Sequence, residues 1–149
     1  MPKHARLFAD GGSRGNPGPA ASGAVLLADD GTPLRELGEY LGVATNNVAE
    51  WNGLLIGLGA ALELGIEELD VCLDSELVVR QLSGAYRVKH PNLIPLYTKV
   101  RSLLRRFARV DVKHVRRAQN AAADALVNRT LDDATAGERG TPPVGREPE

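Results

Sequence analysis

Three strand-like segments in succession, before any helical pattern, are the feature that most constrains how this chain can fold. Apolar, strand-like residues cover positions 6–10, 22–28 and 34–42, and the sequence DDGTP at 29–33 is typical of a hairpin turn. Segments that follow one another so closely pair most simply as antiparallel neighbours. The first part of the chain is therefore predicted to form a three-stranded antiparallel sheet.

Helical and strand-like segments alternate in the rest of the chain. Helices are predicted over 47–65, 76–84, 96–107 and 121–134, and further strands over 69–74 and 110–115. Because helical crossovers connect strands that run in parallel, the last two strands are expected to extend the sheet in parallel. The chain is therefore predicted to be an α/β protein with a five-stranded mixed sheet and helices packed on it.

Local signals mark the ends of these helices. Asn46 or Asn47 can cap the first helix, and Gly65 can end it with a left-handed residue. Ser75 and Asn120 can cap the second and the last helix.

Three glycines lie inside the first predicted helix. Each of Gly53, Gly57 and Gly59 costs about 1 kcal/mol relative to alanine in a helix. We expect close approach of this helix to another backbone to compensate for that cost.

Composition restricts the setting in which this protein works. Cys72 is the one cysteine of 149 residues, so no internal disulfide can form and a reducing cytosol fits. The N-terminus lacks the apolar run of a signal peptide, and no apolar run approaches the roughly 20 residues of a membrane span. We expect a cytoplasmic, monomeric protein without membrane contact.

Residues 1–134 are predicted to form one domain, and the Gly/Pro/charge-rich residues 135–149 a disordered tail or linker.

The net charge of −1 conceals an uneven distribution of charges. Residues 1–85 hold 5 Lys/Arg and 12 Asp/Glu, whereas residues 86–117 hold 10 Lys/Arg and a single acid, Asp111. A short charged run is usually a solvated face, but this imbalance extends over 32 residues. It predicts a surface that faces a polyanion.

Four acidic residues occupy positions that can converge. Asp10 and Asp74 end predicted strands, while Glu50 and Asp124 lie in the first turns of predicted helices. Any one of them could be a turn residue or a partner of a helix dipole. Strand ends and helix starts meet at one edge of an open α/β sheet, however, and four carboxylates gathered there would repel one another. A hard cation relieves that repulsion, and ligands that are all oxygen select Mg²⁺ or Mn²⁺.

These acids lie in four short motifs that resemble those of one enzyme family. The sequences DGGSRGNPG, TNNVAE, LDSELVVRQL and QNAAADALVN, in this order, are similar to the active-site motifs of type 1 ribonuclease H. The resemblance covers residues 5–134 and points to the compact bacterial and archaeal branch. It implies the ribonuclease H-like fold, with helices on both faces of the sheet. Some actinobacterial members of the branch carry a second, phosphatase-like domain after a linker, which would suit residues 135–149.

The resemblance also implies an activity and a cofactor. Asp10, Glu50, Asp74 and Asp124 would be the catalytic residues and would hold two divalent ions, Mg²⁺ or Mn²⁺. The ions would serve hydrolysis of the RNA strand of an RNA–DNA hybrid, leaving 5′-phosphate and 3′-hydroxyl ends.

Substrate contacts are implied in the same way. Contacts to the RNA strand would come from Gly11, Gly12 and Ser13, together with Glu50 and Glu76. Contacts to the minor groove or to a phosphate of the DNA strand would come from Asn16, Thr45, Asn46 and Asn47. Many relatives have Gln where Glu76 stands.

Two departures from the family pattern matter. The segment from Gly84 to Tyr97 is too short for the basic protrusion of well-studied bacterial members, and nearby cations could partly replace it: Arg87, Lys89, Arg101, Arg105 and Arg106. Many members also place a catalytic histidine in a loop before the last acid. His114 matches that histidine by spacing alone, whereas alignment by strands puts His114 inside the fifth strand. In the favoured strand alignment, Arg116 or Arg117 could assist phosphate binding or product release.

Other functions fit part of the pattern. A nuclease of the same fold could act on double-stranded RNA or branched DNA, and a non-catalytic module could bind nucleic acid. A non-catalytic module would be expected to lack one of the four acids, and none is missing. An exonuclease with a similar carboxylate set usually has an Asp-x-Glu pair on its first strand, but Gly11 and Gly12 follow Asp10.

Overall fold

The five strands form one mixed sheet in a computed structural model, which describes residues 3–139. The strands are β1 (His4–Ser13), β2 (Gly18–Leu27), β3 (Pro33–Ala44), β4 (Glu68–Leu73) and β5 (Arg109–His114). Their order across the sheet is β3-β2-β1-β4-β5. The first three strands pair antiparallel, and β4 pairs parallel with both β1 and β5. The predicted order of elements along the chain and the predicted pairing senses are confirmed.

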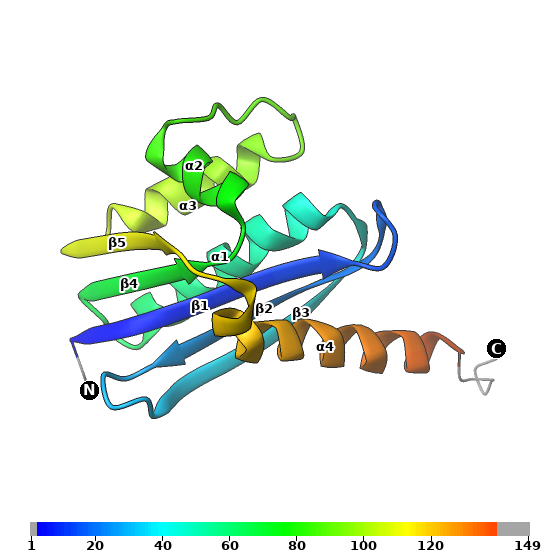
Figure 1. Cartoon of the computed structure of the whole chain (residues 1–149), viewed down its shortest axis with the longest axis horizontal. Coiled ribbons are helices and arrows are strands. Elements are labelled where there is room, and N and C mark those ends of the chain that lie inside the picture. Colours follow the sequence, from blue (N-terminus) through cyan, green and yellow to red (C-terminus); the bar gives the residue numbers. More distant parts are fainter. Residues whose placement is uncertain (1–2, 140–149) are drawn as a thin grey trace.

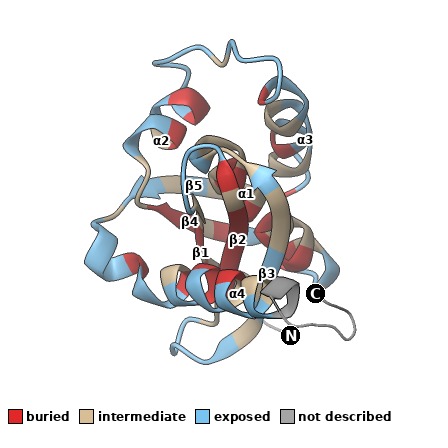
Figure 2. Ribbon diagram, turned by 90° about the vertical axis from the view of Figure 1, so that its right-hand side faces the viewer, coloured by how far each residue is buried: buried red, intermediate tan, exposed pale blue. Residues whose placement is uncertain are grey.

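Helices cover both faces of this sheet, as expected. The helices are α1 (Asn46–Glu63), α2 (Glu76–Ser83), α3 (Ile94–Leu104) and α4 (Ala121–Arg139), and a 3-10 helix, η1 (Arg117–Asn120), precedes α4. Figure 1 shows α4 in front of the sheet and α1 behind it. Figure 2 shows that the buried residues concentrate on the central strands and on the helix surfaces that face them. No helix within residues 3–139 is long and apolar enough to cross a membrane.

The glycines of α1 let this helix pack closely against β1. A Cβ atom on Gly53 would lie 2.4 Å from the carbonyl oxygen of Asp10, so the predicted approach of two backbones is confirmed there. At Gly57 the close neighbour is a side chain instead, because a Cβ would lie 2.5 Å from Cδ1 of Leu7. The prediction is wrong for Gly59, where a Cβ would meet nothing within 4 Å.

Two of the predicted helix caps are confirmed and two are wrong. Gly65 adopts a left-handed φ of 77° after α1, and the Ser75 side chain accepts a hydrogen bond from the Val78 N–H. Thr45, rather than either asparagine, caps α1 by accepting from the Val48 N–H at 3.2 Å. Asn120 does not cap α4, because its side chain donates to the Ala9 carbonyl oxygen instead.

The last helix is longer than its sequence pattern predicts. Helix α4 continues to Arg139, so residues 135–139 of the predicted tail are helical. The remaining part of that predicted tail, 140–149, lies outside the described residues.

Candidate active site

Three partly buried carboxylates from three different segments meet at one edge of the sheet. Oxygen atoms of Asp10, Glu50 and Asp74 lie within 4.8 Å of one another. Asp10 belongs to β1, Asp74 directly follows β4, and Glu50 lies near the start of α1. Gly11 permits this arrangement, because a Cβ there would lie 2.1 Å from the backbone carbon of Ala49. The lack of a side chain therefore brings α1, and with it Glu50, onto the strand that carries Asp10.

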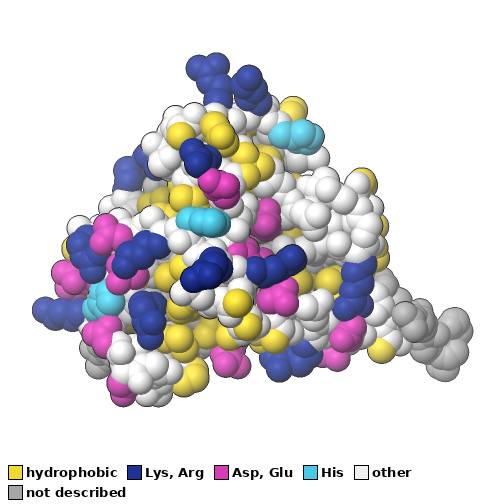
Figure 3. All heavy atoms as spheres, viewed as in Figure 1, with side chains coloured by type: hydrophobic (Ala, Val, Ile, Leu, Met, Phe, Trp, Pro, Cys, Tyr) yellow, Lys and Arg dark blue, Asp and Glu magenta, His cyan; other side chains and the backbone are white. Residues whose placement is uncertain are grey.

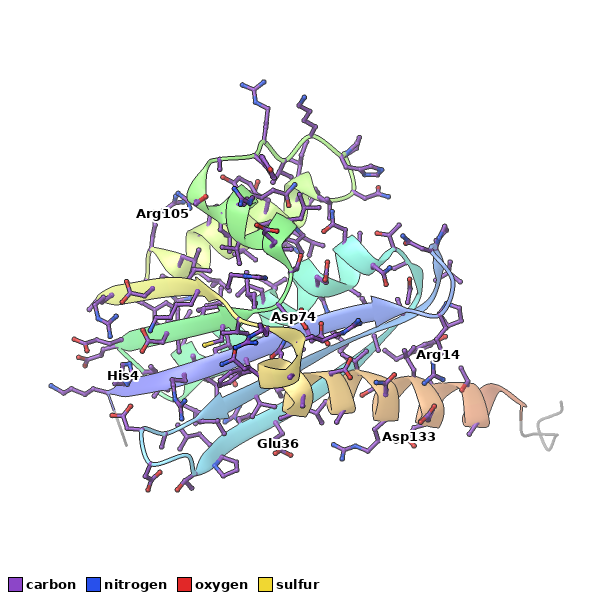
Figure 4. The ribbon with its side chains drawn as sticks, viewed as in Figure 1. His4, Arg14, Glu36, Asp74, Arg105 and Asp133 are labelled. Carbon is purple, nitrogen blue, oxygen red and sulfur yellow. The ribbon has the colours of Figure 1, made fainter. Side chains whose placement is uncertain are left out.

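The fourth predicted acid faces the same space. Asp124, near the start of α4, lines a groove of about 620 Å³ together with Asp10, Glu50 and Asp74. Asp124 is close enough to Asp10 to contribute to the rise in the pKa of that carboxyl. Figure 4 labels Asp74 at the centre of the molecule, between β4 and the start of α4. The structure thus brings together all four acids that the motifs single out.

Burial and neighbouring negative charges raise the pKa of two of these acids, Asp10 and Glu50. Burial raises the pKa of Asp10 to about 7, and the charges of Asp74 and Asp124 act in the same direction. Burial also raises the pKa of Glu50 to about 7, again with help from Asp74, although the Ser75 side chain and Arg117 oppose the rise. The groove therefore gathers more negative charge than its own cations neutralise.

The glycine-rich turn after β1 is tied to the start of α1. The Asn46 side-chain oxygen accepts hydrogen bonds from the backbone N–H of Ser13 at 2.8 Å and from its hydroxyl at 3.1 Å. The Asn46 N–H donates to the Asn16 side-chain oxygen at 3.1 Å. Among the residues predicted to contact substrate, Gly11, Gly12, Ser13 and Asn46 line the groove with the acids.

The lining of this groove does not include the four other predicted contact residues: Asn16, Thr45, Asn47 and Glu76. Thr45 borders a separate hollow of about 430 Å³ beside Pro17 and Val43. The Asn47 side-chain oxygen is buried without a hydrogen-bond partner among the described residues. Glu76 is exposed and forms an ion pair with Arg80 at 2.7 Å.

The structure decides between the two alignments of the histidine. His114 is the last residue of β5 and pairs with Leu73, so the strand alignment is confirmed. The segment between β5 and α4 contains the 3-10 helix η1, with Arg116 at its N-terminal cap. Arg117 lines the groove and lies close enough to Glu50 to lower its pKa.

The groove is also lined by four residues that were not among the predicted site residues: Arg14, Val127, Asn128 and Leu131. Arg14 forms an ion pair with Asp132 at 2.7 Å, and Asn128 donates from its side chain to the Asp124 carbonyl oxygen at 3.1 Å. Asn128 follows Asp124 by four residues, so it lies on the same helix face, and this spacing could have revealed it. Arg14 carried no such signal, because its side chain reaches α4 only in the folded chain.

The basic segment 86–117 contributes a charged surface next to these elements. Figure 3 shows Lys and Arg side chains over the connector between α2 and α3 and over β5, with acidic side chains near the centre of the same face. Two of the cations are engaged by acids: Arg109 lies 3.4 Å and Lys113 3.9 Å from Asp70. A surface that faces a polyanion stays a prediction.

Comparison with known proteins gives consistent matches. Residues 8–130 match a family model described as reverse transcriptase-like. The bifunctional protein Rv2228c of Mycobacterium tuberculosis is 51% identical over 129 residues, which are 86% of this chain and 35% of that protein. Ribonuclease HI of Halobacterium salinarum is 46% identical over 127 residues, which are 85% of this chain and 64% of that enzyme. The chain thus spans about a third of the length of the mycobacterial relative.

Solved structures resemble this fold over nearly their whole length. The N-terminal RNase H domain of Rv2228c, solved as a fusion with maltose binding protein, superposes with a TM-score of 0.84 at 48% identity, covering 87% of this chain and 99% of that one. RNase H1 of Halobacterium salinarum has a TM-score of 0.84 at 44% identity, covering 87% and 98%. LC11-RNase H1, isolated from compost by a metagenomic approach and solved in complex with an RNA/DNA hybrid, has a TM-score of 0.83 at 38% identity, covering 88% and 99%.

Proposed function

This chain belongs to the type 1 ribonuclease H family, and on that premise we propose that it hydrolyses the RNA strand of RNA–DNA hybrids. The products would carry 5′-phosphate and 3′-hydroxyl ends. The observation that carries the proposal is the convergence of Asp10, Glu50, Asp74 and Asp124 in one groove. The hybrid bound by a relative of similar structure supports the choice of substrate.

The donor atoms of the groove fit two divalent cations, Mg²⁺ or Mn²⁺. The four acids offer only oxygen ligands, which these ions prefer over the nitrogen and sulfur ligands typical of zinc sites. Burial is the main cause of the raised pKa values of Asp10 and Glu50, and the charge of Asp74 adds to both, so bound cations would relieve that repulsion. Bound ions would supply positive charge to the scissile phosphate and would make the attacking water more acidic.

The chain's own neutral groups would read the substrate. Backbone N–H groups of Gly11 and Gly12, with the Ser13 hydroxyl, border the acids and can approach the 2′-hydroxyls that distinguish RNA from DNA. Asn46 stands on the same wall and fixes Ser13 through two hydrogen bonds.

The second strand of the hybrid would run past a neighbouring part of the surface. Thr45 borders the hollow beside Pro17, and we assign Asn16, Thr45 and Asn47 to the DNA strand. Glu76 stays a candidate for the RNA strand, although Arg80 must release it first.

We propose a cellular setting and a domain context for the enzyme. A cytoplasmic, monomeric protein agrees with a free, buried Cys72. A further domain in the full-length protein is supported by the mycobacterial relative, of which the matched region is 35%.

Substitution of Asp10 tests the proposed site. We expect Asp10→Asn to abolish Mg²⁺-dependent cleavage of a labelled hybrid while hybrid binding, measured by fluorescence anisotropy, persists. Asp133→Asn, an exposed acid on α4, is the matched control and should cleave like the unmodified protein. Cleavage by Asp10→Asn at the unmodified rate would show that the site is elsewhere.

A substrate panel separates the competing functions. Hybrid, double-stranded RNA, branched DNA and duplex DNA are offered side by side with Mg²⁺ or with Mn²⁺. The proposal requires the hybrid to be the preferred substrate, cut in its RNA strand. Preference for another duplex would favour a different nuclease of this fold, and binding without cleavage would favour a non-catalytic module.

A further inference from the structure

The central strand β1 loses one neighbour immediately before its catalytic acid. Pairing between β1 and β4 ends at Ala9 opposite Leu73, and beyond this point the described residues of β1 pair only with β2. Asp10 is the first residue past the end of that pairing. The two strands separate from Asp10 onward, directly after Ala9.

The Asn120 side chain, from the C-terminal part of the chain, contacts β1 at this point. The Asn120 amide nitrogen donates to the Ala9 carbonyl oxygen at 2.9 Å, and the Asn120 side chain is fully buried. Asn120 is the last residue of η1 and directly precedes α4, one helical turn before Asp124. One hydrogen bond therefore connects the residue before Asp10 with the start of the helix that carries Asp124.

Stability alone does not account for an asparagine here. Its side-chain oxygen is buried without a partner among the described residues, and such an orphaned acceptor costs free energy. An apolar side chain of similar size, such as leucine, would avoid that cost. The bond to Ala9 is what an apolar residue cannot supply.

The start of α4 is held at a second point as well. A Cβ on Gly23 of β2 would lie 2.6 Å from the Ala123 carbonyl oxygen, so helix and sheet are in direct contact there. Because this contact fixes one point of the helix, the hydrogen bond between Asn120 and Ala9 determines the distance between the first turn of α4 and β1.

We propose that Asn120 is a positioning residue that fixes Asp124 against Asp10 and thereby sets the affinity of the groove for divalent cations. The inference rests on the proposed function, because it takes the four acids as cation ligands.

Direct measurement of cation binding tests this role without any substrate. Mn²⁺ is titrated into the full chain by calorimetry, for the unmodified protein and for Asn120→Leu, Asn120→Asp and Gln81→Leu. Loss of a group that orients metal ligands typically costs about 10–100-fold in metal affinity. We expect both Asn120 variants to bind Mn²⁺ more weakly by this factor. Asn120→Asp keeps the shape of the side chain but places an acceptor, instead of the amide donor, beside the Ala9 carbonyl oxygen. This variant therefore tests the proposal even if Asn120→Leu does not fold.

Gln81→Leu is the matched control. Gln81 is a buried amide that accepts from the Trp51 indole N–H at 3.3 Å, and it lies outside the groove lining. Its loss should lower the unfolding temperature and leave Mn²⁺ affinity unchanged. Equal affinities for the Asn120 variants and the unmodified protein, or an equal loss in Gln81→Leu, would overturn the proposal.

Cleavage assays keep this inference separate from the proposed function. If the unmodified protein binds Mn²⁺ but cuts no hybrid, the proposed function fails while the calorimetry still decides the role of Asn120. If it cuts the hybrid and Asn120→Leu needs no more Mg²⁺ for half-maximal rate, the proposed function stands and the positioning role is wrong.

Discussion

Single residues define the groove by the charge they bring to it. Asp10 and Glu50 are largely shielded from water, and each lies beside Asp74. Among the described residues that line the groove, Arg14 and Arg117 are the cations, and Arg14 is already paired with Asp132. The site is therefore suited to bind cations first and a polyanion through them.

His114 allows a prediction at this scale. The residue is exposed and stands at the end of β5, and it does not line the groove. We expect His114→Ala to lower kcat/KM for hybrid cleavage by less than about 10-fold, measured at saturating Mg²⁺. A general acid–base group contributes at least about 10²-fold, so a loss of that size would contradict the structural placement.

At the scale of elements, the contact between α1 and β1 positions two of the acids. Gly11 on β1 lies against the backbone of α1, and Gly53 on α1 lies against the backbone of β1. Because neither residue has a side chain, Asp10 on the strand and Glu50 on the helix come within ligand distance. The cost of glycine in a helix is offset by this approach rather than by any property of the helix itself.

A pair of alanine substitutions in α1 tests that statement. Gly53→Ala would place a Cβ 2.4 Å from the Asp10 carbonyl oxygen, so we expect a loss of stability of about 1–3 kcal/mol and slower cleavage. Gly59→Ala meets nothing within 4 Å and should stabilise the protein by roughly 0.5–1 kcal/mol without slowing cleavage. Urea unfolding measures both, and equal effects of the two variants would disprove the close-packing argument.

At the scale of the whole molecule, we expect the acids of the groove to make stability depend on pH and, under the proposed function, on divalent metal. The pKa of Asp10 and of Glu50 is about 7 in the folded protein, against roughly 4 in an unfolded chain. Between these values the folded state binds more protons than the unfolded state. The free energy of unfolding of the metal-free protein must therefore fall as the pH rises from about 4 to about 7.

Thermal and chemical unfolding in EDTA across this interval measures the effect. We expect the metal-free protein to lose stability steadily across this interval, and added Mg²⁺ should largely restore the loss at neutral pH. The double variant Asp10→Asn/Glu50→Gln should show a flatter pH dependence and little response to Mg²⁺. Asp133→Asn should retain the full dependence, and a metal-free protein equally stable at both ends of the interval would refute the argument.

The sequence by itself determined the order of elements, the sense of strand pairing and the identity of the four acids. These features depend on hydrophobic periodicity, on turn signals and on motifs, and each of these signals lies within a short segment of the sequence. The caps at Ser75 and Gly65 were predictable for the same reason, since each depends on neighbours within one helical turn.

Only the tertiary structure decided which partner each polar side chain takes. Asn46 binds Ser13 and leaves the cap of α1 to Thr45, and Asn120 binds Ala9 instead of capping α4. The register of His114 and the packing of Gly53, but not Gly59, depend likewise on neighbours from distant parts of the chain. Such contacts are set when elements pack, because the free energy of a buried hydrogen bond or close approach depends on groups that no local pattern contains.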